Sequence, residues 1–156
     1  MVDRRTFCAG AAAAALLPLT ARDALAQGAA AFQMWHSPGC GCCLEWARRI
    51  QAEFRRPLRV IETADMAALK RASGIPANLQ SCHTARVAGV LVEGHVPPAD
   101  IRRLIQSGNP RRLGLAVPGM PAGSPGMDVG HNHRQPYSVF AFDARGGRSV
   151  FARHGG

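Results

Sequence analysis

The segment Cys40-Gly41-Cys42-Cys43 places three cysteines within four residues, and another follows at Cys82. An apolar run at 32–36 and a Ser-Pro-Gly turn precede it, and a helical pattern follows at 44–50. We therefore predict that the three cysteines lie where a strand ends and a helix begins. Backbone N–H groups and the helix dipole stabilise negative charge there, so we expect the pKa values of these thiols to fall. Clustered thiolates suit either a soft metal such as Cu(I) or disulfide exchange.

The first 26 residues have the features of an export signal. Arg4-Arg5-Thr6-Phe7 resembles a twin-arginine motif, residues 9–19 form an apolar run, and Ala24-Leu25-Ala26 is an A-x-A cleavage site. We expect cleavage after Ala26 and a periplasmic protein, exported by the Tat or the Sec route. The apolar run is too short to span a bilayer, and no other segment is long and apolar enough to do so.

Four cysteines remain in the predicted mature chain, and an oxidising compartment would favour two disulfides. A disulfide between the neighbours Cys42 and Cys43 would be strained. Cys40 and Cys43 have the C-x-x-C spacing of redox proteins, whereas Cys40 and Cys42 have a tighter C-x-C spacing that is common in metal chelation. Two interpretations stay open: a metal-binding thiolate cluster, or a Cys40–Cys43 disulfide with two bystander thiols.

Hydrophobic periodicity predicts an α/β fold. We expect helices over 42–54, 66–72 and 101–106, the second capped by Asp65, and strands over 31–36, 58–62, 86–92 and 95–96. The order β-α-β-α-β-β-α is that of thioredoxins and glutaredoxins, so residues 31–107 are predicted to form a thioredoxin-like three-layer core. A typical thioredoxin has a cis-proline before its third strand, packed against the thiols. Here Cys82 occupies that stretch and is expected beside the cysteine turn, which favours a thiolate cup over ordinary disulfide exchange.

Residues 108–136 are rich in proline and glycine, and contain Met120 and Met127. No helical or strand period is visible, so we predict a long loop that packs onto the domain. Residues 137–142 and 148–152, separated by a turn around Gly146-Gly147, are predicted to form a β-hairpin completing the same domain. His154, near the chain end, is expected to be disordered.

The formal net charge of +9 comes from basic residues scattered along the chain, of which only Lys70 is a lysine. No long basic tract or aromatic ladder accompanies them, so the charge indicates a solvated basic surface rather than nucleic-acid binding. No Ser/His/Asp arrangement, carboxylate pair or phosphate loop supports hydrolytic chemistry.

Four separate motifs together resemble one known family. They are Ser-Pro-Gly-Cys-Gly-Cys-Cys at 37–43, Ser-Cys-His-Thr-Ala at 81–85, Val-Glu-Gly-His-Val-Pro at 92–97, and the Pro/Gly/Met-rich segment 114–127. The chain is similar over about residues 32–152 to the exported CopG-like family linked to copper resistance. This resemblance implies a thioredoxin-like fold, copper binding through cysteines, a role in periplasmic copper handling, and a further copper redox activity.

The resemblance also implies site residues. The family's cysteines match Cys40, Cys42, Cys43 and Cys82, the predicted metal ligands. Its other characteristic positions match Met120, Met127, His83 and His95, which would be further ligands or would support the ligands. His131 and His133 lie outside the family pattern and would either capture Cu(II) at the surface or belong to a solvated loop.

Copper, as Cu(I), is the metal that thiolate and thioether ligands favour, and zinc is the alternative because tetrahedral thiolate sites also hold zinc. The expected partners are copper ions and periplasmic copper-handling or electron-transfer proteins. The pattern favours a metal-binding protein over an enzyme. If the chain is an enzyme, we expect a copper oxidoreductase or a thiol-disulfide oxidoreductase in which Cys40 attacks and Cys43 resolves.

Overall fold

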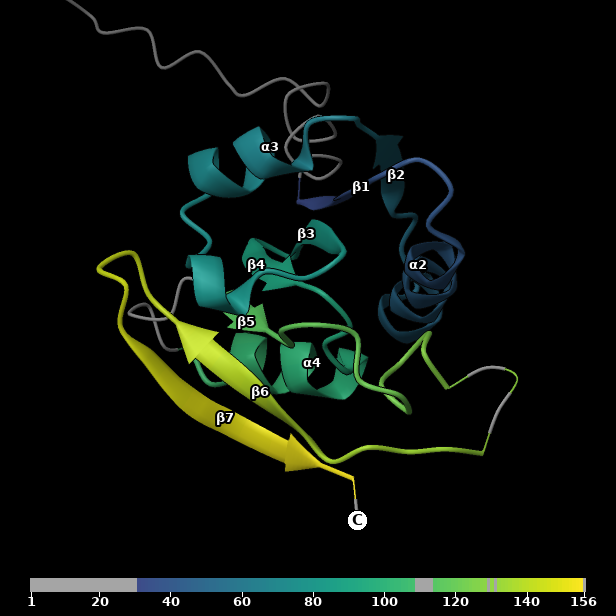
Figure 1. Ribbon diagram of the computed structural model, residues 1–156. Coiled ribbons are helices and arrows are strands. Elements are labelled where there is room, and N and C mark those ends of the chain that lie inside the picture. Colours follow the sequence, from purple (N-terminus) through teal and green to yellow (C-terminus); the bar gives the residue numbers. More distant parts are fainter. Residues whose placement is uncertain (1–30, 109–113, 129, 131, 156) are drawn as a thin grey trace, which may run out of the picture.

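The computed structural model describes residues 31–108, 114–128, 130 and 132–155. Within these ranges the chain forms a mixed α/β fold with three α-helices and one seven-stranded sheet (Figure 1). None of the helices in these ranges has the length and apolarity of a bilayer span. The predicted export signal at 1–26 lies outside the described residues.

The first two strands and all three predicted helices are confirmed. They are β1 (Phe32–His36), α2 (Gly41–Phe54), β2 (Arg59–Glu62), α3 (Met66–Ala72) and α4 (Pro98–Gln106). Helix α2 buries residues spaced three or four apart, among them Trp46 and Ile50, and its C-cap, Arg55, has the left-handed conformation. Asp65 caps α3 as predicted, because its carboxylate accepts the backbone N–H of Ala68 at 2.8 Å.

The predicted single strand over 86–92 is wrong. The chain instead forms a hairpin of β3 (His83–Val87) and β4 (Val90–Glu93), and residues 95–96 form no strand. Ala88 and Gly89 make the turn with φ of 50° and 85°, as two-residue hairpin loops require. Alanine is unusual at positive φ, and apolar residues flank the turn on both sides. The sequence therefore reads as one continuous strand.

The sheet order is β2-β1-β3-β4-β5-β6-β7. The predicted terminal hairpin is confirmed as β6 (Tyr137–Phe142) and β7 (Arg148–His154). Strand β5 (Gly114–Ala116) lies parallel to β4, so the prediction that 108–136 lacks a strand is wrong. Three residues are too few to show a period. The expectation that His154 is disordered is also wrong, because it ends β7 and its Nε2 lies 2.6 Å from an Asp100 carboxylate oxygen.

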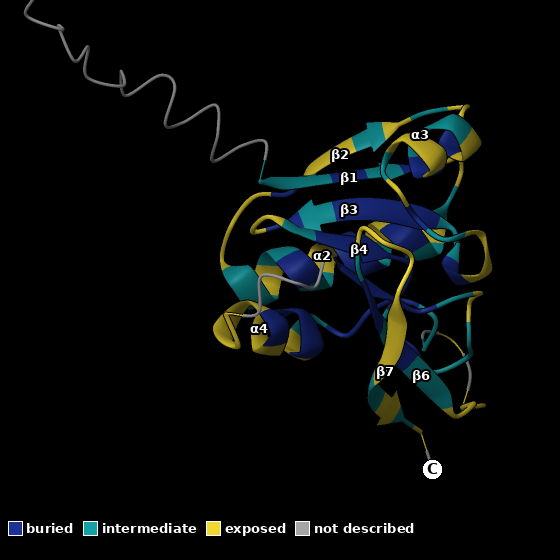
Figure 2. Ribbon diagram, turned by 90° about the vertical axis from the view of Figure 1, so that its left-hand side faces the viewer, coloured by how far each residue is buried: buried dark blue, intermediate teal, exposed yellow. Residues whose placement is uncertain are grey.

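Helices α2 and α4 pack on one face of the sheet, and α3 lies on the other with the short 3₁₀ helix η1 (Ala77–Leu79) (Figure 1). Side chains alternate between faces, so β3 turns Ala85 toward α2 while its neighbour Thr84 faces Lys70 of α3. The interior strands β3 and β4 are largely buried (Figure 2). This arrangement is a helix-covered sheet with a core on each side.

The topology brings distant segments to one edge of the sheet. Strand β1 ends at His36, which pairs with His83, the first residue of the antiparallel β3. Strand β4 then runs back to the same edge and ends at Glu93, opposite Thr84. The cysteine turn, the segment before β3 and the segment after β4 therefore meet there.

Candidate metal centre

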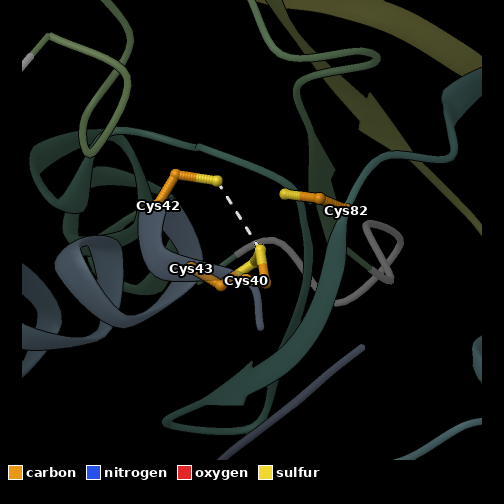
Figure 3. A group of neighbouring side chains, drawn as sticks. All are labelled: Cys40, Cys42, Cys43 and Cys82. Carbon is orange, nitrogen blue, oxygen red and sulfur yellow. Dashed lines mark hydrogen bonds between the residues drawn. A yellow bond between two sulfur atoms is a disulfide. The ribbon is translucent and has the colours of Figure 1, made fainter. Parts of the chain in front are cut away.

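Four cysteine sulfur atoms converge at this edge. Cys40 is the N-cap of α2, Cys42 and Cys43 lie in its first turn, and Cys82 directly precedes β3. Their sulfur atoms all lie within 4.8 Å of one another. Figure 3 shows the Cys42 and Cys82 side chains pointing toward each other beside the other two cysteines. The predicted convergence of Cys82 on the cysteine turn is thus confirmed.

Two of the four cysteines are joined. Cys40 and Cys43 form a disulfide with a Cα–Cα distance of 5.3 Å, while Cys42 and Cys82 are free thiols. The Cys42 sulfur lies 3.6 Å from that of Cys40. A disulfide sulfur carries no thiolate charge, so only the reduced protein offers four thiolates to a metal. The pairing is the one that the disulfide-exchange interpretation expects.

Two histidines extend the cluster. The Cys82 sulfur lies 3.3 Å from Nδ1 of His83 and 3.0 Å from Nε2 of His95, and these three ligand atoms also lie within 4.8 Å of one another. The opposite nitrogen of His95 donates to the Pro125 carbonyl at 2.8 Å. Neutral imidazole has one N–H, so this bond leaves the lone pair of Nε2 facing the Cys82 sulfur. Such an outer hydrogen bond is typical of histidines that ligate metals.

The donor set fits a soft metal ion. Thiolates and neutral imidazoles are the ligands that Cu(I) and zinc prefer. In addition, the buried Nε2 of His83 has no hydrogen-bond partner among the described residues. It is not the nitrogen that faces the Cys82 sulfur, which is Nδ1 of the same ring.

Burial controls protonation at the site. It raises the pKa of Cys82 to about 12, with a smaller contribution from the neighbouring Cys42. The fall in pKa that we predict for thiols at the helix start therefore does not extend to Cys82, which lies before a strand. Burial also lowers the pKa of His83 well below its usual value and lowers that of His95. Both imidazoles are thus neutral at pH 7, whereas the Cys82 thiol must lose its proton to bind a metal.

The loop after β5 packs onto the site. Gly126 lies so close to α2 that a Cβ atom there would be 2.7 Å from the Cys42 carbonyl oxygen and 3.3 Å from Nδ1 of His95. Arg49 of α2 donates two hydrogen bonds of 2.8 Å to the Asp128 carboxylate, which also accepts the Gly126 N–H. This ion pair lowers the pKa of Asp128. The loop therefore joins the start of α2 to His95.

We expect Gly126→Ala to destabilise the fold by about 2–4 kcal/mol, because the added methyl group enters occupied space at a φ of +91°. Gly119→Ala is the matched control, since Gly119 also has a positive φ, of +69°, but no atom within 4 Å of an added Cβ. It should cost about 1 kcal/mol. Urea unfolding measures both, and equal losses would show that the close approach of Gly126 contributes nothing.

The remaining predicted residues differ in their placement. Met120 is 53% exposed, and Met127 is half-buried next to Gly126, so their roles as ligands stay predictions. His133 is exposed, and His131 lies outside the described residues. Trp46 packs beside the site, with its ring centroid 4.4 Å from that of His83.

Sequence reasoning missed two buried charged residues below the site, Lys70 and Glu93. Two signals could have identified them. Lys70 is the only lysine of the chain, and Glu93 ends an otherwise apolar strand.

A separate cavity of about 600 Å³ lies beside β6 and β7. Its lining includes Tyr137, Phe140, His154 and three prolines, and it contains none of the cysteines. Burial raises the pKa of Tyr137 to about 12, so its hydroxyl stays protonated at neutral pH. The cavity therefore has mixed walls, with Ser138 and Arg153 beside the apolar and aromatic side chains, and it does not share the chemistry of the sulfur cluster.

The fold and the cluster define a class: a mixed α/β protein whose cysteines and histidines are arranged to hold a metal. Comparison with known proteins identifies the family within this class. Residues 79–127 match the family described as protein of unknown function DUF411. Form 1 of copper resistance protein CopG is 39% identical, with a TM-score of 0.69 over 80% of this chain and 96% of that chain. Form 2 is 38% identical, with the same TM-score over 79% and 96%.

The chain therefore belongs to the DUF411 family of CopG-like copper resistance proteins. No protein of curated function matches it significantly.

Proposed function

We propose that this protein binds Cu(I) through Cys40, Cys42, Cys43 and Cys82 in the periplasm, and thereby serves copper resistance or copper trafficking. The observation that carries the proposal is the convergence of four sulfur atoms from two distant segments within 4.8 Å. Soft thiolate sulfur favours Cu(I) over Cu(II). The 39% identity to a copper resistance protein supports copper as the metal. The element order β-α-β-α-β-β-α supports a thioredoxin-like core.

The proposed location rests on the sequence of the first 26 residues. The twin-arginine-like motif, the apolar run and the A-x-A site support export and cleavage after Ala26. N-terminal sequencing of the periplasmic protein tests this directly. A mature chain that retains these residues, or one confined to the cytoplasm, would contradict it.

Cys42 and Cys43 are adjacent in the sequence, and we expect strain if both bind the same metal ion. Sulfur atoms shared between several Cu(I) ions would relieve this crowding, so the site is expected to bind more than one ion. The test is anaerobic loading of the reduced protein with Cu(I), followed by metal analysis and X-ray absorption. Copper–sulfur bonds and a ratio above one support the proposal, whereas a ratio of one contradicts the multinuclear site. Preferential retention of zinc in competition with Cu(I) would contradict copper as the metal.

The second candidate function is thiol-disulfide exchange, and the Cys40–Cys43 disulfide is the observation that favours it. Cys40 would attack a substrate disulfide, and Cys43 would then displace the mixed disulfide. Insulin reduction by metal-free protein measures this activity. Two results together would establish a thiol-disulfide oxidoreductase instead. Insulin reduction would need Cys40 and Cys43 but neither Cys42 nor Cys82, and the reduced protein would bind no copper.

We expect the Cu(I) affinity of the reduced protein to rise with pH. Because the pKa of the Cys82 thiol is raised to about 12, this group is protonated throughout the neutral range and releases a proton when copper binds. Protons therefore compete with copper, and affinity falls as the pH falls. Replacing Cys82 with serine should lower the slope of log affinity against pH by about one. Chelator competition between pH 6 and 9 measures it, and an unchanged slope would place Cys82 outside the copper site.

A further inference from the structure

A buried ion pair lies under the segment that carries Cys82. Lys70 of α3 and Glu93 at the end of β4 are 5% and 0% exposed. The Lys70 ammonium donates to the Glu93 carboxylate and, at 3.1 Å, to the Thr84 hydroxyl. A buried ion pair is often no more stabilising than apolar residues of similar volume, because both charges lose their water. The presence of this ion pair therefore points to a role in fixing the position of the segment that carries Cys82.

The Glu93 carboxylate reaches both sides of the Cys82-His83 dipeptide. One oxygen accepts the backbone N–H of Ser81 at 2.6 Å, and the other accepts the Thr84 hydroxyl at 2.6 Å. Ser81 directly precedes Cys82, and Thr84 directly follows His83. One buried group thus holds the residues on both sides of this dipeptide.

The residues after Glu93 also contact the segment that carries Cys82. The Gly94 N–H donates to the His83 carbonyl at 2.9 Å. A Cβ at Gly94 would lie 2.5 Å from the Ser81 Oγ, so only glycine permits this close approach. His95 follows at once, with its Nε2 beside the Cys82 sulfur. The strand end that supplies Glu93 therefore also fixes His95 relative to Cys82.

We propose that Glu93 is a positioning residue for the metal site: its carboxylate, balanced by Lys70, fixes Cys82 opposite the cysteine turn through Ser81 and Thr84. The part of this proposal that concerns metal binding by the site rests on the proposed copper-binding function. The placement of Cys82 can be measured without copper. The carboxylate accepts hydrogen bonds from Lys70, Ser81 and Thr84, and no apolar side chain can accept any of them.

The test compares two double variants that both remove the buried charges together. Lys70→Met/Glu93→Gln keeps an amide oxygen that can accept the Ser81 N–H, whereas Lys70→Met/Glu93→Leu has a similar volume and no acceptor. Both are made in a Cys40→Ser/Cys43→Ala background. There, diamide takes two electrons and two protons from the thiols of Cys42 and Cys82 and joins them in a disulfide. The rate of this reaction reports how well the two sulfur atoms are held together.

We expect the leucine variant to form the disulfide at least about tenfold more slowly than the background protein, and the glutamine variant to stay within about threefold. With all four cysteines present, Cu(I) affinity should fall by about 10- to 100-fold for leucine and much less for glutamine. Equal rates in all proteins, or equal losses in both folded variants, would overturn the proposal. A rate difference in a protein that binds no Cu(I) would uphold the positioning role and refute the copper function instead.

If the leucine variant does not fold, Thr84→Val provides the same test. It removes the hydroxyl that donates to Glu93 while keeping the volume, and Thr84→Ser restores a hydroxyl. Slower disulfide formation in Thr84→Val, recovered in Thr84→Ser, supports the proposal. Identical rates in the two variants overturn it.

Discussion

Replacing Cys82 with serine is expected to lower the Cu(I) affinity of the reduced protein by more than about 100-fold. Loss of a group that only supports a ligand already costs about 10- to 100-fold, and Cys82 is a ligand under the proposed function. Cys82 also belongs to both groups of donors. Its sulfur lies within 4.8 Å of the other cysteine sulfurs and within 4.8 Å of the ligand nitrogens of His83 and His95. Its loss should therefore weaken both groups of donors. Competition with a chromophoric Cu(I) chelator measures the change.

The matched control is His154→Gln, which alters a histidine on β7 that bonds to Asp100, a residue outside the metal cluster. It should leave the Cu(I) affinity unchanged. Insulin reduction through Cys40 and Cys43 should persist in the Cys82 variant if the protein has that activity. Wild-type copper affinity in the Cys82 variant would remove this residue from the site and leave the disulfide pair as the functional centre.

Forming the Cys40–Cys43 disulfide is expected to have a larger effect than the loss of Cys82. It should lower the Cu(I) affinity by at least about 1000-fold relative to the reduced protein. The bond removes two of four thiolates and leaves Cys42 and Cys82 as the free sulfur donors. Anaerobic chelator competition on the oxidised and reduced proteins measures the difference. Thiol counting before and after each titration checks that the disulfide is retained.

A Cys40→Ser/Cys43→Ser variant separates loss of thiolates from the constraint that the disulfide imposes. It should bind as weakly as the oxidised protein. If the oxidised protein binds Cu(I) as tightly as the reduced protein, then Cys42, Cys82 and the two histidines are sufficient, and the disulfide pair has a separate role.

The parts of the fold that were predictable depend on local pattern. Helix α2 shows its apolar face at a spacing of three and four, and Asp65 marks the start of α3. The β3–β4 hairpin was not predictable in this way, because its turn places Ala88 at a φ that alanine rarely adopts. Strand β5 was equally unpredictable from the sequence, since its three residues owe their conformation to pairing with β4.

The site was predictable as far as residue chemistry identifies it. Spacing and softness single out the four cysteines, and the family pattern points to His83 and His95. The supports of the site depend on tertiary contacts: Lys70 meets Glu93 only because α3 covers the opposite face of the sheet, and Asp128 meets Arg49 only because the loop returns to α2. Interactions between residues so far apart in sequence leave no periodic signal.

Under the proposed function, the register between β1 and β3 decides when the copper site can be assembled. The pairing of His36 with His83 brings Cys82 to the cysteine turn, so in an unfolded chain Cys82 is not held beside the other three cysteines. If the chain is exported in extended form, it would cross the membrane without the assembled four-sulfur site, which would form only after folding. If it folds before export, the same site could be loaded with metal before the chain crosses.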